Sequence, residues 1–157
     1  DNDAQQSVVY CRFRFLLPEL AGKGITGSLR LQQANNRTAA FIGFEPKGAA
    51  FDVLAGDGDG KGGIRWQKAG RVEPGAWFTV DVKLDFNKKT FDVSVDGLNW
   101  ETNRNFRHAA QWVGTMWAEN LKDRAYRYDI EAGAALPVLV SEAAFSSDPF
   151  PAVEARK

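Results

Sequence analysis

Two carboxylates in the segment Arg127-Tyr-Asp129-Ile-Glu131 are the first candidates for acid–base chemistry in this sequence. On a strand, residues i and i+2 share one face at roughly 6.5 to 7 Å, and a retaining glycosidase places its two catalytic carboxyl groups about 5 to 5.5 Å apart. A Glu-x-Asp-x-Glu strand would present a nucleophile, a helper and an acid in a row, but here Arg127 stands at the nucleophile position. A guanidinium cannot attack an anomeric carbon, and its charge lowers the pKa of a neighbouring acid. We therefore expect no glycoside hydrolysis, and a charged strand face is the favoured interpretation.

Other catalytic schemes find little support. His108 is the only histidine, so a Ser-His-Asp or Cys-His unit has one base and no flanking signature. A tyrosine-dependent lyase that uses Tyr126 or Tyr128 with Arg127 stays open as an alternative, although no spacing favours it. Zinc is not expected, because its ligands would have to be carboxylates with one histidine. The sequence favours a protein that is not an enzyme, and no catalytic residue is assigned.

The loop Gly56-Asp-Gly-Asp-Gly-Lys-Gly-Gly63 could hold a metal ion. Asp-x-Asp turns with intervening glycines can curl so that carboxylate and carbonyl oxygens converge on Ca²⁺. A full loop of the EF-hand type would add a third oxygen ligand and a distal Glu, but Lys61 follows instead. The loop is therefore either a plain flexible connection or a structural calcium site with Asp57 and Asp59 as ligands.

Aromatic side chains suggest a binding role. Sugars present weakly apolar C–H faces rimmed by hydroxyls, which suit Trp and Tyr rings beside polar groups, and five Trp in 157 residues is a high count. Trp100 opens a polar run that contains Asn103 and Arg104, and this predicts an exposed ring with hydrogen-bonding neighbours. Trp112 and Trp117 are an odd number of positions apart, so on one strand they face opposite sides, and one of them is expected in the core. Trp117 is taken as the second binding candidate.

The polar face of the first predicted strand offers a further group, formed by Tyr10, Arg12 and Arg14. Arg127 and Asp129 line a similar face late in the chain. Arginines could bind uronate or sulfate groups through two parallel hydrogen bonds from each guanidinium. The favoured alternative is a solvated ladder of Arg–Asp pairs across neighbouring strands, each worth a fraction of a kcal/mol.

The elements that position these residues are strands. From Trp77 to Phe86 and from Lys88 to Val95, apolar and polar residues alternate with a period of two around a short polar turn, which predicts an antiparallel hairpin with one buried face. The side chains expected in the core are Phe78, Val80, Val82, Leu84, Phe91, Val93 and Val95, whereas Lys83, Asp92 and Ser94 are expected outside it. Further strands are predicted at 8–17, 25–33, 38–44, 49–55, 63–67, 111–118, 126–131 and 137–141. One helical turn is considered at 103–111. About ten short strands separated by turn residues predict an antiparallel two-sheet sandwich or barrel.

The order of these segments resembles a known superfamily. The Trp77-Phe-Thr-Val-Asp-Val strand, the Phe91-Asp-Val-Ser-Val-Asp-Gly97 strand and the late Tyr126-Arg-Tyr-Asp-Ile130 strand are similar to concanavalin A-like lectin/glucanase domains, and especially to laminin-G-like bacterial jelly rolls. The resemblance spans most of residues 8–131. It implies an all-β, antiparallel two-sheet jelly-roll β-sandwich over residues 1–145, followed by a tail or linker at 146–157. It also implies a family of glycan binders, some glycan-cleaving enzymes and some protein-binding modules, among which calcium sites are frequent.

Composition narrows the remaining classes. The net charge of zero gives no reason to expect nucleic acid or an anionic membrane as a partner, and no apolar run approaches the ~18 residues of a membrane span. The single cysteine, Cys11, excludes an internal disulfide and is expected as a small buried thiol. The first residue is Asp1 and no signal peptide is present, so we expect either a mature secreted, periplasmic or cell-surface chain or an excised domain.

Taken together, the residues predict a non-catalytic carbohydrate-binding module or accessory domain of an exported bacterial protein. The first alternative is a glycoside hydrolase or polysaccharide lyase of the same fold. The second is a protein–protein interaction or structural sandwich in a surface assembly. The sequence leaves open which glycan is bound and how many copies associate.

Overall fold

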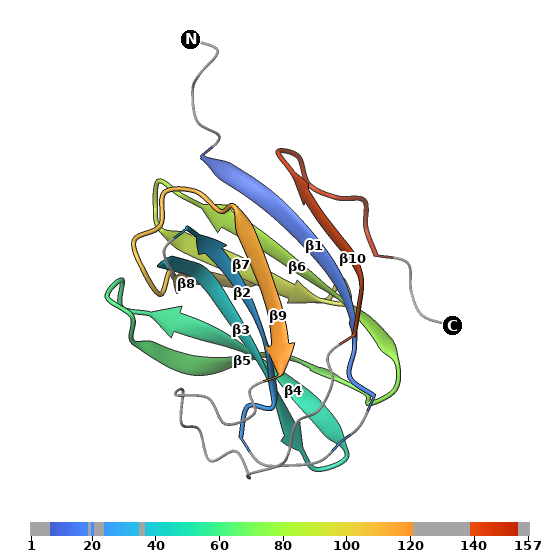
Figure 1. Cartoon of the computed structure of the whole chain (residues 1–157). Coiled ribbons are helices and arrows are strands. Elements are labelled where there is room, and N and C mark those ends of the chain that lie inside the picture. The colour runs from blue at the N-terminus through green and yellow to red at the C-terminus, as the bar shows by residue number, and fades with distance from the viewer. Residues whose placement is uncertain (1–6, 19, 21–23, 35–36, 121–138, 154–157) are drawn as a thin grey trace.

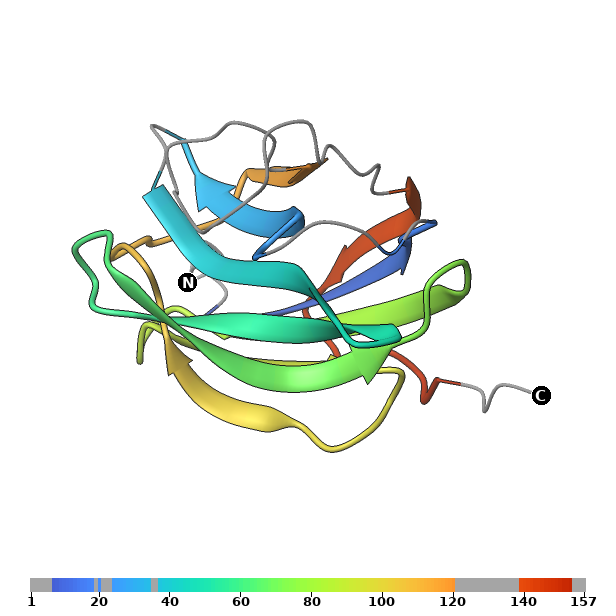
Figure 2. The same ribbon diagram turned by 90° about the horizontal axis from the view of Figure 1, so that it is seen from below.

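The chain folds as a sandwich of two five-stranded antiparallel sheets (Figures 1 and 2). The computed structural model describes residues 7–18, 20, 24–34, 37–120 and 139–153, and within these ranges it contains strands and turns but no helix. The strands are β1 (Val8–Leu16), β2 (Gly27–Gln33), β3 (Arg37–Lys47), β4 (Ala50–Gly58), β5 (Ile64–Val72), β6 (Trp77–Asp85), β7 (Thr90–Val95), β8 (Glu101–Asn105), β9 (Thr115–Asn120) and β10 (Leu139–Ser146). Sheet A has the order β10-β1-β6-β7-β8, and sheet B has the order β5-β4-β3-β2-β9. The predicted all-β, two-sheet jelly-roll sandwich is confirmed.

The hairpin of β6 and β7 has the predicted buried face. Val82 pairs with Val93 and Leu84 with Phe91, and all seven side chains assigned to the core are buried. The prediction for Ser94 was wrong, because this residue is only 1% exposed. Its hydroxyl donates to the Leu98 carbonyl at 2.7 Å, since the turn at Asp96 and Gly97, both with positive φ, folds the chain back over it.

The core between the sheets is rich in phenylalanine. Phe15 and Phe78 of sheet A meet Phe44 of sheet B, with ring centres 5.6 to 5.8 Å apart. Fully burying such a side chain contributes roughly 1.5 to 3 kcal/mol each, so this cluster holds the two layers together. Cys11 lies in the same core and is fully buried, as expected.

Several predicted boundaries differ from the structure. Residues 101–105 form strand β8, not part of a helical turn, because they pair with β7 across a bulge that only the tertiary fold provides. The strand predicted at 111–118 begins later, at Thr115, and the one predicted at 63–67 extends to Val72. The strand predicted at 126–131 lies outside the described residues.

The segment after β8 inserts beside β3. The backbone N–H groups of Arg107 and His108 donate to the carbonyls of Ala39 and Thr38, at 3.1 and 2.8 Å. On the other side, the N–H of Gly62 donates to the Arg107 carbonyl at 2.9 Å. Gly58 is needed where this segment passes, because a Cβ atom there would overlap the backbone of Phe106. The insertion carries the Arg107 side chain to the outer face of sheet B.

Part of the region expected as a tail contacts the sandwich. Strand β10 continues to Ser146, the Phe150 ring centre lies 5.1 Å from Cζ of Arg12, and a Cβ atom on Gly97 would lie 3.1 Å from Cβ of Val153. The domain boundary at residue 145 stays a prediction. Across the described ranges, no helix is long and apolar enough to cross a membrane.

Candidate functional site

The outer face of sheet B carries a row of aromatic and arginine side chains. We call Trp117 (β9), Arg30 (β2), Phe41 (β3) and Trp66 (β5) the aromatic row. Trp117 is paired with Arg30, and Arg30 with Phe41, in the strand register. Cζ of Arg30 lies 5.6 Å from the Trp117 ring centre, and the Phe41 and Trp66 rings meet edge to face at 5.1 Å. The row therefore runs from one edge of sheet B to the other.

A glycine makes room for the Trp66 ring. A Cβ atom on Gly43 would lie 3.0 Å from Cη2 of Trp66. Gly56 of β4 is paired with Trp66, and a Cβ atom there would lie 3.4 Å from Cβ of Phe41. Because Gly43 lacks a side chain, the indole can lie against the sheet and contact Phe41 across β4.

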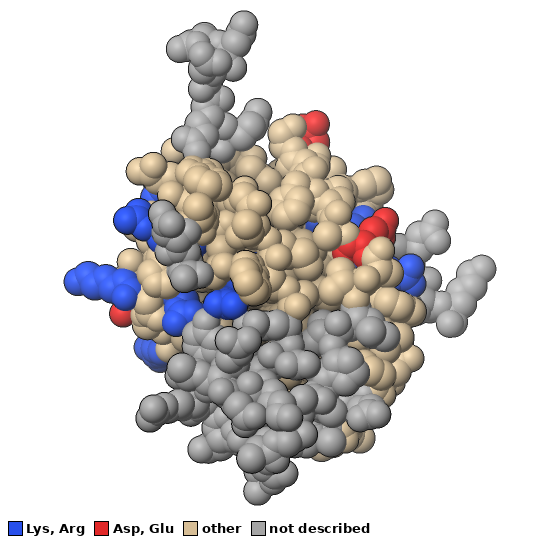
Figure 3. Space-filling view, viewed as in Figure 1, with Lys and Arg blue, Asp and Glu red and all other residues tan. Residues whose placement is uncertain are grey.

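Arg107 extends the row from the inserted segment. Its Cζ lies 5.2 Å from the Phe41 ring centre, and its Nε donates to the Gly62 carbonyl at 2.8 Å. Phe41 is fully buried beneath these neighbours, whereas Trp117 is 48% exposed. Figure 3 shows Lys and Arg side chains gathered toward the left of this view. The face thus combines a buried aromatic base with an accessible indole and two guanidinium groups.

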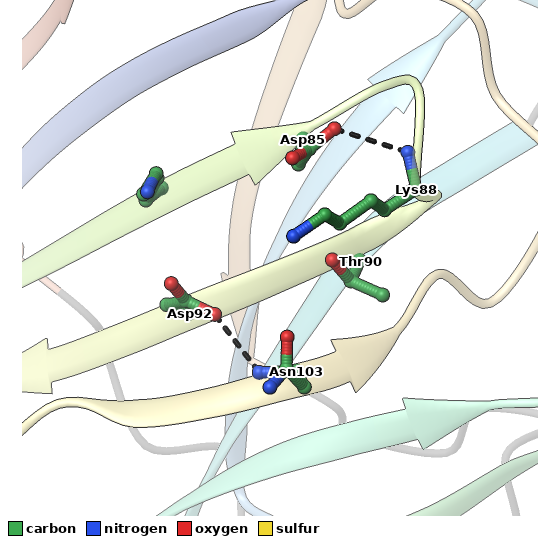
Figure 4. Close-up of a pocket in the computed structure, with 6 residues that line it drawn as sticks. Asp85, Lys88, Thr90, Asp92 and Asn103 are labelled. Carbon is green, nitrogen blue, oxygen red and sulfur yellow. Dashed lines mark hydrogen bonds between the residues drawn. The ribbon is translucent and has the colours of Figure 1, made fainter.

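A polar pocket lies on the opposite face of the sandwich, on sheet A (Figure 4). Its volume is about 40 Å³, and it is lined by Lys83, Asp85, Lys88, Thr90, Asp92 and Asn103. We call it the sheet A pocket. These side chains come from β6, the β6–β7 turn, β7 and β8, so the pocket forms only when three strands assemble.

Tyr10 and Arg12 lie on this same sheet A face, as the strand alternation predicted. Tyr10 is paired with Lys83, whose Nζ lies 6.0 Å from the tyrosine ring centre. Arg12 forms a bidentate pair with Asp81, with Nε–Oδ1 and Nη2–Oδ2 distances of 2.7 and 2.8 Å. It is a cross-strand Arg–Asp pair, as the favoured alternative expected, but its partner is Asp81 of β6, which is buried and not solvated. Asp129, on the strand with which the ladder was expected, lies outside the described residues.

The polar run predicted after Trp100 does not form a single site, because its residues belong to strand β8. The Trp100 ring is 44% exposed, in agreement with an exposed loop position, and Asn103 lines the sheet A pocket. Arg104 pairs in register with the buried Phe91 and contacts Glu101 through Nη2 at 3.2 Å. The structure therefore groups Asn103 with Tyr10 on sheet A, while Trp117 lies on sheet B. Arg127, the remaining candidate, is outside the described residues.

The prediction that Trp112 or Trp117 would be in the core was wrong. Both side chains are exposed, at 42% and 48%. The alternation argument required one strand to contain both residues, but β9 begins at Thr115. Trp112 precedes the strand, so its direction is independent of Trp117.

The two aspartates of the glycine-rich loop accept hydrogen bonds from the protein. Oδ1 of Asp59 accepts the N–H groups of Lys61 and Gly63 at 2.7 and 2.9 Å, and these bonds lower the pKa of Asp59. Oδ1 of Asp57 accepts the backbone N–H of Asn105 at 2.7 Å. Among the described residues, no three His, Cys, Asp or Glu side chains cluster as a metal site. Calcium binding by Asp57 and Asp59 stays a prediction.

Several residues of both sites were missed by sequence reasoning. Lys83 and Asp92 were assigned to the exposed side of the hairpin, but their meeting with Asn103 depends on the β7–β8 pairing. Arg30, Phe41 and Trp66 come from three separate strands. The alternation along β2 and β3 would have predicted that Arg30 and Phe41 lie on the outer face of the sheet. It could not predict that Arg30 lies beside Trp117, because that depends on the pairing of β2 with β9.

Comparison with known proteins was informative only at the level of structure. Neither a protein-family model nor a curated protein matches this chain. An alginate lyase from Pseudomonas aeruginosa matches with a TM-score of 0.56 and 13% identity over 90% of this chain, which spans 65% of the lyase. A SAP-like pentraxin from Limulus polyphemus matches with a TM-score of 0.55 and 10% identity over 92% of this chain and 66% of the pentraxin.

A reconstructed ancestral congerin matches with a TM-score of 0.52 and 12% identity, covering 88% of this chain and 91% of the congerin. At such identities the likeness shows only that the strands are arranged in the same way. The chain has the concanavalin A-like jelly-roll fold.

Proposed function

We propose that this chain is a non-catalytic carbohydrate-binding domain of an exported protein, and that the outer face of sheet B contacts the glycan. The observation that carries the proposal is the aromatic row, with Trp117 half exposed beside Arg30. The fold is shared with proteins named as lyases of polysaccharides, which supports a carbohydrate ligand at the level of class.

The chemistry of the row suits a sugar ring. An indole offers a flat apolar surface to the C–H groups of a pyranose, and such contacts are worth more when the ring is held rigidly. The guanidinium of Arg30 against Trp117 limits the motion of the indole, and guanidinium N–H groups donate to hydroxyl or carboxylate oxygens. An exposed Trp beside an Arg therefore provides both a stacking surface and hydrogen-bond donors.

The state of His108 argues against this residue as a general base. This single histidine accepts the backbone N–H of Thr38 through Nδ1 at 3.0 Å, so the nitrogen that a general base would use is occupied. Burial lowers the pKa of His108 below its ordinary 6.5, and the positive charge of Arg107 lowers it further. Its role is the attachment of the inserted segment to β3.

The proposal is tested with a polysaccharide and oligosaccharide array, followed by titration of the best ligand with intrinsic Trp fluorescence as the readout. Trp117→Ala is expected to weaken binding about 5- to 150-fold, as for the loss of a central aromatic contact worth about 1 to 3 kcal/mol. Trp112→Ala is the matched control, because this Trp is equally exposed but lies outside the aromatic row. It should bind as the wild type does.

Catalysis is measured in parallel by two assays. Hydrolysis releases new reducing ends, and lyase activity releases unsaturated products that absorb ultraviolet light. No product is expected from the ligands that bind. Turnover of any polysaccharide would overturn the non-catalytic assignment in favour of a hydrolase or lyase. If no glycan on the array binds, the alternative of a protein–protein interaction or structural domain is favoured.

A further inference from the structure

We propose that the sheet A pocket is a second carbohydrate site, which takes the hydroxyl-bearing edge of a neutral sugar residue. The pocket lies on the face of the sandwich opposite the aromatic row, and its argument uses its own contacts alone. Lys83 pairs with Asp92, and Asp85 with Thr90, across β6 and β7, so these four side chains project from one face. Asn103 from β8 and Lys88 from the turn complete the lining (Figure 4).

The backbone holds the pocket in a defined shape. Oδ1 of Asp85 accepts the N–H groups of Asn87 and Lys88 at 3.1 and 3.0 Å, which fixes the turn. Oδ1 of Asp92 accepts the N–H of Asn103 at 2.9 Å. Asn103 has a φ of 59°, in the left-handed region that Asn adopts more readily than most residues. It lies where the register between β7 and β8 shifts, and this irregularity turns β8 toward the pocket.

Each aspartate keeps an oxygen for a ligand. Among the described residues, none donates a hydrogen bond to Oδ2 of Asp85 or Asp92. Lys83 and Lys88 likewise have no carboxylate within 4.0 Å in the described part of the chain. The pocket therefore presents hydrogen-bond donors and acceptors that the fold itself leaves uncommitted.

The balance of charge selects the ligand class. Two lysines and two aspartates line the pocket, so their formal charges cancel. Because the lysines and aspartates balance, the pocket offers no net electrostatic attraction to a uronate or sulfate group. A sugar hydroxyl both donates and accepts, so adjacent hydroxyls can donate to a carboxylate while accepting from an ammonium or amide N–H. This arrangement favours a neutral sugar over a charged one.

The size of the pocket limits what enters. The pocket is small, at about 40 Å³, and we place only the hydroxyl-bearing edge of the sugar in it. The Tyr10 ring, next to Lys83 on the sheet, offers an apolar flank for the rest of the sugar. With so few contacts we expect dissociation constants near 1 mM or weaker. Together with the aromatic row, such a site would let one domain contact two glycan chains.

The test is a titration of ¹⁵N-labelled protein with methyl glycosides of glucose, galactose and mannose up to about 100 mM, with methyl glucuronide as the charged comparison. At least one neutral glycoside should shift the amide signals of Lys83, Thr90, Asp92 and Asn103 more than the glucuronide does. If no neutral glycoside shifts these signals, or if the glucuronide shifts them more, the proposal is overturned.

Three variants each remove one side-chain group of the protein that would contact the sugar, while preserving the backbone. Asp92→Asn keeps the oxygen that accepts the Asn103 N–H, Asn103→Gly tolerates the positive φ, and Lys83→Met keeps the aliphatic stem. Each should reduce the affinity of the responding glycoside at least fivefold, whereas Lys47→Met, a lysine at the end of β3, should leave it unchanged. Unaltered affinity in all three would also contradict the proposal.

Trp117→Ala separates the two sites. It should leave the shifts in the sheet A pocket intact while weakening polysaccharide binding. Loss of the pocket shifts in the Trp117→Ala variant would mean that the two responses come from one site on sheet B, which contradicts an independent second site.

Discussion

Nδ1 of His108 accepts a hydrogen bond from the backbone N–H of Thr38, with the two nitrogens 3.0 Å apart. An imidazole nitrogen can accept only when it carries no proton, so this contact requires the neutral ring with its proton on Nε2. The same two residues are joined a second time, because the His108 N–H donates to the Thr38 carbonyl at 2.8 Å. The pair fastens the segment after β8 to sheet B.

The stability of the fold should therefore fall in mild acid. The pKa of His108 is lowered in the folded state by burial, so below about pH 6.5 the unfolded chain binds a proton that the folded chain does not. The free energy of unfolding should decrease from pH 7 to pH 5, as measured by urea denaturation. His108→Asn, whose side-chain oxygen can accept the Thr38 N–H, should show a smaller decrease. An identical pH dependence in this variant would contradict the assignment.

Val82→Asp should unfold the domain. Val82 is fully buried between β1 and β7, and an unpaired carboxylate there is expected to cost more than about 4 kcal/mol, a large part of the stability of a typical domain. Circular dichroism at 25 °C is the measurement. Lys83→Asn is the control on the same strand, because its side chain lies on the outer face of sheet A and the change should cost less than about 1 kcal/mol. A Val82→Asp protein that melts within a degree of the wild type would contradict the burial of this face.

The thiol of Cys11 should be unreactive toward thiol reagents in the folded protein. Burial raises the pKa of its thiol to about 12, and the thiolate is the reactive form. At pH 8 a disulfide reagent such as dithiobis(nitrobenzoate) is expected to react only after addition of denaturant, at one thiol per chain. Rapid reaction without denaturant would show that β1 opens readily or that the core is accessible.

Calcium binding by Asp57 and Asp59 is tested through thermal stability. An ion that binds only the folded state raises the melting temperature through mass action, so the prediction is a rise at 5 mM CaCl₂ over EDTA that Asp59→Asn abolishes. MgCl₂ at the same concentration controls for ionic strength. Equal melting curves with calcium and with chelator would leave Asp59 as a turn-forming residue, bonded to the N–H groups of Lys61 and Gly63.

The sequence alone determined those parts of the fold that depend on local alternation. The hairpin of β6 and β7 could be predicted, with Val82 and Phe91 inside and Lys83 outside, because side chains of a strand alternate between its two faces and only one face is covered. The exposure of Trp100 was predicted for a similar reason, since it follows a turn and precedes a polar run. The class of fold followed from the number and spacing of such strands.

Tertiary structure decided which side chains meet. Ser94 became buried because a turn folded over it, and β8 formed because β7 offered a partner to a segment without alternation of its own. The aromatic row joins Trp117 to Arg30, and the sheet A pocket joins Asn103 to Lys83, in both cases from strands that are not consecutive in the chain. A period of two fixes the face of the sheet on which a side chain lies. The neighbours of that side chain depend on strand order and register, which the packing of the two sheets decides.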